Sequence, residues 1–190
     1  MKIIRVVFIS LVCITFLPGW GFGKQKQTIE QRRQEVQDMR AQVLDDLEKE
    51  APGIHEMVDN AVGYAVFSSL GMNLFLVSSA RGPGIAHDNR NGKEVYMKMF
   101  SAGVGIGLGV KDFRLVFVFE TEEALLDFIV DGWAASAQAD AAATHDGEGD
   151  ATSLAIDIAP GVKLFQSTES GLALQATIQG TKYYLDEELN

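Results

Sequence analysis

The chain has 190 residues, of which 47% are hydrophobic and four are proline, so it can form one globular domain with a proper core. Its formal net charge of -10 makes it a poor general partner for nucleic acid or for anionic membrane surfaces, and we expect no nucleic-acid binding. The single cysteine, Cys13, excludes a disulfide framework.

Residues 1–23 have the pattern of a signal peptide. Lys2 and Arg5 precede and enter an apolar run, Val6–Leu17, and small residues follow up to Gly23. The run is shorter than the roughly 20 residues that a membrane-spanning helix needs. We therefore expect an exported mature chain without cysteine and with a charge of -12. Lipidation at Cys13 is a weaker alternative, because Val12 stands where lipoproteins have a small residue.

Residues 24–60 are predicted to be helical. The stretch from Lys24 to Glu50 lacks glycine and proline, and Thr28 with Gln31 forms a capping box. Pro52-Gly53 ends this helix, and a short helix, Ile54–Asn60, is expected to follow. The polar face of the long helix mixes both signs of charge, which favours packing on the domain over lying on a membrane. Its apolar stripe consists of Ile29, Val36, Met39, Val43 and Leu47.

From residue 61 to 190 the pattern predicts a β-rich domain. Gly63–Phe67 and Asn73–Ser79 are predicted strands, with turns expected at Ser68–Gly71 and at Arg81–Gly84. Asn91-Gly92 is a strong hairpin signal, because both central positions of a type I′ turn require positive φ. The strand that follows, beginning near Val95, should return antiparallel to residues 84–88.

Glycine then occupies every second position from Gly103 to Gly109, which predicts a strand with one face free of side chains. The apolar residues between the glycines keep strand period, unlike a phosphate-binding loop. Lys111-Asp112 is expected to form a turn, and Phe113–Phe119 to return as the second strand of a long hairpin. Such a bare face implies the close approach of a backbone, a helix or an apolar ligand.

The last third of the chain mixes one helix with further strands. Thr121 caps a predicted helix that ends at Asp131-Gly132, and Trp133–Ala143 fits either a helix or a strand. Three strands are expected at 155–158, 161–167 and 172–179. The fold class is therefore α+β, an antiparallel, barrel-like β domain with an N-terminal amphipathic helix and short packing helices.

No local motif carries catalysis, a metal or a cofactor. The three histidines have no partner at metal-site spacing, the acidic loop 145–150 lacks the order of a calcium loop, and no serine lies in a GxSxG elbow. What stands out is apolar surplus around the glycine strand, which predicts a slot for acyl chains with cations at its rim to meet a phosphate. The predicted lipid-binding residues are Lys98, Gly103, Gly105, Gly107, Gly109, Lys111, Phe113 and Arg114.

A series of segments resembles the SYLF family of lipid-binding domains, in its bacterial exported branch. The resemblance covers roughly residues 60–190 and implies a barrel-like antiparallel domain that binds phospholipid without known catalysis. The helix at 24–50 is mixed in charge, whereas eukaryotic members bind phosphoinositides through a basic helix, so the lipid class stays open. The segments are Gly63–Phe67, Gly82–Ile85, Gly92–Met99, Gly103–Gly109, Lys111–Arg114, Val116–Phe119, Ser170–Thr177 and Gly180–Tyr184.

Three functions remain as hypotheses. The leading one is a periplasmic or secreted, non-enzymatic phospholipid-binding protein at the periphery of the envelope membrane, with no cofactor. The alternative is an envelope scaffolding module that binds a protein partner through the N-terminal helix. The third is a lipid hydrolase with a serine site that only the fold assembles.

Overall fold

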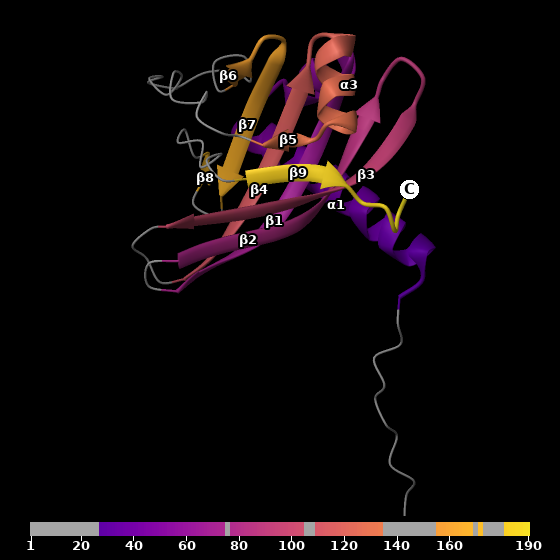
Figure 1. Cartoon of the computed structure of the whole chain (residues 1–190). Coiled ribbons are helices and arrows are strands. Elements are labelled where there is room, and N and C mark those ends of the chain that lie inside the picture. The colour runs from indigo at the N-terminus through magenta and orange to yellow at the C-terminus, as the bar shows by residue number, and fades with distance from the viewer. Residues whose placement is uncertain (1–26, 75–76, 105–108, 135–154, 169–170, 173–180) are drawn as a thin grey trace, which may run out of the picture.

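The computed structural model describes residues 27–74, 77–104, 109–134, 155–168, 171–172 and 181–190 (Figure 1). Three helices are present in these ranges: α1 (Ile29–Glu50), α2 (Ile54–Asn60) and α3 (Glu122–Val130). The long strands are β1 (Gly63–Leu74), β2 (Val77–Asp88), β3 (Lys93–Val104) and β4 (Gly109–Phe119). The short strands are β5 (Trp133–Ala134), β6 (Ile156–Ala159), β7 (Val162–Thr168), β8 (Gly171–Leu172) and β9 (Thr181–Leu185).

The described strands form one antiparallel sheet in the order β5-β9-β3-β2-β1-β4-β7-β6, with β8 paired to β7. The sheet is strongly curled. Tyr183 on β9 lies 5.0 Å from Phe117 on β4, measured between ring centroids, although β3, β2 and β1 separate the two strands in the sheet. The predicted α+β class, with a barrel-like antiparallel sheet and an N-terminal helix, is confirmed.

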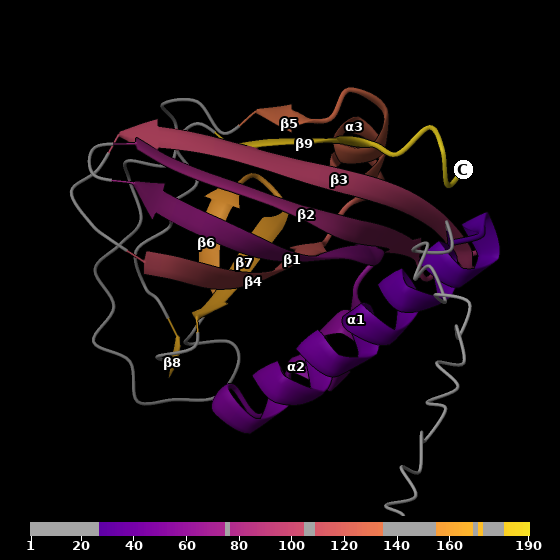
Figure 2. The same ribbon diagram turned by 90° about the horizontal axis from the view of Figure 1, so that it is seen from below.

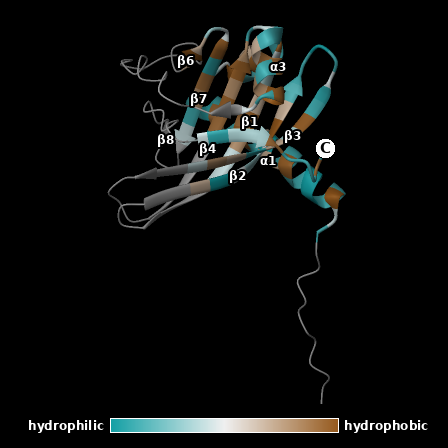
Figure 3. Ribbon diagram, viewed as in Figure 1, coloured by the Kyte–Doolittle hydropathy of each residue, from teal (hydrophilic) through white to brown (hydrophobic). Residues whose placement is uncertain are grey.

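The inner face of this curl is filled by aromatic rings. Phe128 of α3 lies 5.0 to 6.1 Å from the rings of Phe67, Phe117, Phe119 and Tyr183. Figure 3 shows hydrophobic residues gathered on the parts of β4 and β7 near α3. Phe128 packs edge-to-face on Phe67 and tilted on the other three rings, which adds to the burial of their area, so α3 closes this end of the sheet.

α1 lies along the outer face, at an angle to the strands (Figure 2). The predicted capping box is present: the Thr28 hydroxyl accepts from the Gln31 amide, and the Gln31 side chain accepts from the Thr28 amide. Val43 and Leu47 of the predicted stripe are buried against β1, β4 and β7, while Ile29 is 50% exposed. The apolar contacts of the helix with the sheet begin at Val36, and before it the Arg33 guanidinium lies 5.7 Å from the centroid of the Tyr96 ring on β3.

The predicted hairpin of the glycine strand with Phe113–Phe119 is wrong. β3 pairs with β2 and β9, whereas β4 pairs with β1 and β7, so two strands lie between β3 and β4. β4 aligns with β1 from Gly63↔Phe119 to Asn73↔Gly109, which places Lys111 and Asp112 inside a strand and not at a turn.

The turns predicted at Ser68–Gly71 and Arg81–Gly84 are also wrong, since both segments lie within β1 and β2. A β-carbon on Gly84 would lie 2.1 Å from the Phe67 ring, and one on Gly82 would lie 1.9 Å from the Ser68 carbonyl oxygen. Glycine here serves the close approach of a neighbouring strand rather than a turn. The predicted antiparallel return along residues 84–88 is confirmed. The ladder closes at Asp88↔Lys93, so residues 89–92 form a four-residue turn in place of the two-residue type I′ turn, with a φ of 71° at Gly92.

The helix and strands predicted after residue 120 agree more closely with the structure. α3 begins after its Thr121 cap and ends before Gly132, and β6 and β7 match two of the three predicted strands. Most of the third strand, and of the segment 133–143, lies outside the described residues. None of the helices in the described ranges is both long and apolar enough to cross a membrane.

Candidate functional site

The predicted glycine slot is divided between strands. Gly103 pairs with Ser78 on β2, and Gly109 pairs with Asn73 on β1, while Gly105 and Gly107 lie outside the described residues. The glycines whose backbone is described therefore belong to two strands that are not neighbours.

The remaining predicted residues are placed by the ladder of β4. Lys111 pairs with Gly71, and Phe113 pairs with Ser69 and with Thr168. Arg114 follows, opposite Ser68 and Ser167. Residues 109–114 of β4 thus lie beside residues 68–73 of β1. In the sheet, β1 and β2 separate them from β3 and Lys98.

Lys98 and Arg114 each already have a carboxylate partner. The Lys98 ammonium lies 2.8 Å from Asp186 Oδ1, and the Arg114 guanidinium lies 3.3 Å from Asp46 Oδ2 on α1. A phosphate would have to compete with these carboxylates. The two cations therefore support the fold around a site more directly than they present charge to a ligand.

A pocket of about 420 Å³ opens beside Lys98, between the first turns of α1, strands β2 and β3, and the segment after β9. We call it the α1–β9 pocket. Its apolar lining consists of Val36, Pro83, Met99, Tyr184 and Leu189.

One wall of this pocket is the segment Asp186–Asn190, which is fixed to β3 at Tyr96. The Asp186 amide donates to the Tyr96 carbonyl (2.9 Å). The Asn190 side chain pairs with the Tyr96 backbone as a strand would, accepting from its amide (3.0 Å) and donating to its carbonyl (2.8 Å). Arg33 of α1 donates to the Leu189 carbonyl (2.8 Å), so the helix and the wall hold each other in place.

Two acidic side chains of that wall, Asp186 and Glu188, are paired with cations. Asp186 is 3% exposed and lies between Lys98 and Arg32, whose guanidinium is 3.6 Å away. Arg32 also binds Glu188 at 2.8 Å, and this hydrogen bond lowers the pKa of Glu188. A buried carboxylate flanked by two cations is stabilised where an unpaired one would be costly.

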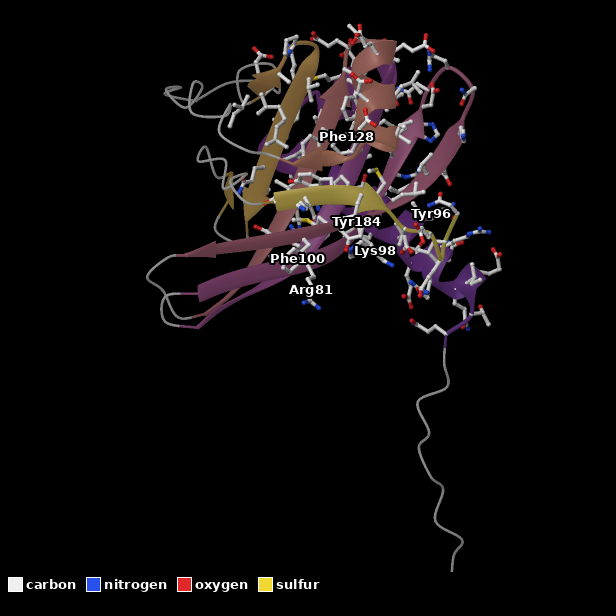
Figure 4. The ribbon with its side chains drawn as sticks, viewed as in Figure 1. Arg81, Tyr96, Lys98, Phe100, Phe128 and Tyr184 are labelled. Atoms are coloured by element: carbon white, nitrogen blue, oxygen red, sulfur yellow. The ribbon has the colours of Figure 1, made fainter. Side chains whose placement is uncertain are left out.

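Arg81 differs from the other cations of the pocket. It is exposed, and its guanidinium lies 5.3 Å from the centroid of the Phe100 ring, which faces it across the β2–β3 ladder. Figure 4 shows the two side chains on the same side of the sheet as Lys98. In the part of the chain that the structure describes, Arg81 has no carboxylate partner.

Two side chains of β9 extend this surface. Lys182 pairs with Phe100 and is exposed, and Tyr184 pairs with Lys98 and is 44% exposed. We call Arg81, Phe100, Lys182 and Tyr184 the sheet-face patch. It combines cations with aromatic rings on a protein whose overall charge is strongly negative.

Sequence reasoning missed this patch. Arg81 was assigned to a turn, and a signal that could have found it is the long β2–β3 pairing from Asp88↔Lys93 onward, which aligns Arg81 with Phe100. The partner of Lys98 is Asp186, which is far away in the sequence, so no pattern near Lys98 predicts this ion pair. Among the described residues no group of three or more histidine, cysteine, aspartate or glutamate side chains is placed to hold a metal ion.

Comparison with known proteins gives one relationship to report. The chain is 33% identical over 163 residues to Beta cell expansion factor A of Aeromonas veronii. The matched part makes up 86% of this chain and 60% of that protein, so the chain spans about three fifths of its relative's length. No family model matches the chain.

Proposed function

We propose that this chain is an exported, non-enzymatic phospholipid-binding protein of the SYLF type, which contacts lipid through the sheet-face patch and the adjoining α1–β9 pocket. The observation that carries the proposal is the exposed Arg81 guanidinium, which lies over the Phe100 ring at the edge of the α1–β9 pocket and has no carboxylate partner among the described residues. The resemblance of residues 60–190 to SYLF domains agrees with it.

The chemistry of the patch suits the headgroup region of a bilayer. Arginine presents planar donors that bind phosphate oxygens in pairs, and it does so while stacked on an aromatic ring. Tyrosine has an apolar ring with a polar tip, and it is enriched where hydrocarbon meets water. An acidic protein can bind an anionic surface only where its cations are concentrated, and here Arg81 and Lys182 lie on either side of Phe100.

The proposal changes the roles of the residues predicted from the sequence. Lys98 forms the wall of the pocket through Asp186, and Arg114 fastens β4 to α1 through Asp46. In this proposal Arg81 contacts the phosphate, in place of Lys98 and Arg114. Gly103 lies on β3 three residues beyond Phe100, so a ligand on the patch would lie close to it.

The alternative function, a partner bound through the N-terminal helix, receives less support. Val36, Val43 and Leu47 of its apolar stripe are buried against the sheet. A partner would therefore meet the polar outer side of α1 and Ile29, which is 50% exposed.

Vesicle co-sedimentation of the exported, purified protein tests the proposal. Arg81→Gln should weaken binding to phospholipid vesicles about fivefold, which corresponds to roughly 1 kcal/mol per interfacial cation. Arg81→Lys should recover part of the loss, because the charge returns without the planar stack.

Lys93→Gln is the matched control. It removes the same charge at the opposite end of the β2–β3 hairpin, and it should leave binding unchanged. Absence of binding to every vesicle composition, together with native mass spectra free of co-purified lipid, would overturn the proposal.

A further inference from the structure

Two charged side chains that line the α1–β9 pocket have no partner of opposite charge in the described residues. One is Arg81 on β2. The other is Glu35 on α1, which is exposed and accepts a hydrogen bond from the Gln27 side-chain amide. One positive and one negative group are thus left available on the walls of one pocket.

The other charges of the pocket are matched within the protein. Lys98 and Arg32 are balanced by Asp186 and Glu188, through contacts of 2.8 to 3.6 Å. A ligand that competed for Lys98 or Arg32 would have to displace a carboxylate from a buried or well-ordered contact. Arg81 and Glu35 can be used at no such cost.

We infer, building on the proposed lipid binding, that the pocket takes a zwitterionic amino-phosphate headgroup, with its phosphate on Arg81 and its primary ammonium on Glu35. Phosphoethanolamine is the smallest lipid headgroup of this chemistry. An ammonium offers three N–H donors to a carboxylate. A trimethylammonium offers none, and a glycerol headgroup brings no positive charge to Glu35.

Apolar side chains complete the fit. Val36, Pro83 and Leu189 line the same pocket as Arg81 and Glu35. Their low polarity strengthens both electrostatic contacts once water is displaced, because the local dielectric falls. The short carbon chain between phosphate and ammonium would contact this lining.

The test compares vesicles of phosphatidylcholine doped with either phosphatidylethanolamine or phosphatidylglycerol. Wild-type protein should bind the ethanolamine vesicles more tightly than the glycerol vesicles. Glu35→Gln should reduce this preference by about two- to fivefold, the range of an exposed ion pair, chiefly by weakening the ethanolamine arm.

Glu56→Gln serves as the matched control. Glu56 is exposed on α2, away from the pocket lining, so its substitution should leave the preference unchanged. Soluble glycerophosphoethanolamine, added as a competitor, separates recognition of the headgroup itself from recognition of a membrane surface. Competition that Glu35→Gln abolishes would support the inference.

The outcomes distinguish the two proposals. A wild-type preference for phosphatidylglycerol, or a preference that Glu35→Gln does not change, would overturn the inference and leave general lipid binding in place. Binding of soluble glycerophosphoethanolamine without vesicle binding would keep the inference and overturn the membrane function. Binding of neither form would overturn both.

Discussion

The outer face of β2 and β3 has two regions with different properties, separated by only a few residues along the same strands. Under α1, Ile85 and Tyr96 pack against Val36, and Arg40 binds Glu94 at 2.6 Å. Beyond the helix, Arg81 lies on Phe100 without a carboxylate partner in the described chain. The difference indicates that one sheet face stabilises the fold where a helix covers it and is available for binding where the helix is absent.

The covered region also contains a half-buried histidine, His87. His87 lies 5.3 Å from the Tyr64 ring, measured between ring centroids, and its buried Nδ1 has no hydrogen-bond partner within the described residues. Burial, reinforced by the charge of Arg40, lowers the pKa of His87. Charges in this region thus contribute to stability, while those of the sheet-face patch are predicted to contribute to binding.

The largest expected effect is on stability in the covered region. Ile85→Ala should reduce the free energy of unfolding by about 2–5 kcal/mol, because Ile85 is fully buried beneath α1. Phe100→Ala, on the neighbouring strand in the uncovered region, should cost less stability and weaken vesicle binding instead. Urea unfolding and co-sedimentation of both variants check this contrast. Equal stability losses would contradict the division.

A smaller effect concerns acid. The pKa of His87 is lowered below its unfolded value of 6.5, so the unfolded chain takes up a proton first as the pH falls. This contribution to stability is fully present above pH 6.5 and is lost as the pH falls from there through the lower pKa of His87 in the folded protein. Urea unfolding at several pH values should show the loss in wild type, and His87→Gln should reduce it.

His55→Gln is the control for this measurement. His55 is exposed on α2, outside the covered region, so comparing the two variants separates the effect of His87 from that of removing any histidine. An unchanged acid dependence in His87→Gln would exclude the half-buried imidazole of His87 as its source.

The smallest effect is expected at Lys182. Lys182→Gln removes a flexible exposed cation from the sheet-face patch and should weaken vesicle binding less than Arg81→Gln, by under fivefold. Raising the salt concentration should reduce the difference from wild type, because exposed charges are screened. A loss as large as that of Arg81→Gln would show that the stacked guanidinium has no special role.

The features predicted correctly from the sequence depend on neighbouring residues. The capping box of Thr28 and Gln31, the Gly92 turn and the Thr121 cap each use contacts within a few residues, so local patterns were sufficient. The failures concern the choice of strand partners. Nothing near Phe113 indicates that β4 pairs with β1 rather than with β3.

The candidate site was only partly predictable for the same reason. Lys98 was identified as a cation beside an apolar region, but Asp186, which neutralises it, lies far along the chain. Gly82 and Gly84 match the composition of a turn. In the structure they instead leave room for groups on β1, the Ser68 carbonyl beside Gly82 and the Phe67 ring beside Gly84. Arg81 was therefore predicted to lie in a turn and not on a strand, so the sheet-face patch could not be predicted.

The position of β4 has a consequence for the order in which the molecule assembles. β1, β2 and β3 are consecutive strands joined as a meander, so their ladders can form while the chain is still short. β4 follows β3 in the chain but pairs with β1. Its ladder therefore joins residues that are farther apart in sequence than those of the β1–β2 and β2–β3 ladders, and forming it costs more loop-closure entropy. We expect the joining of β4 to limit the folding rate, and until it occurs the edge of β1 is open to pairing with another molecule.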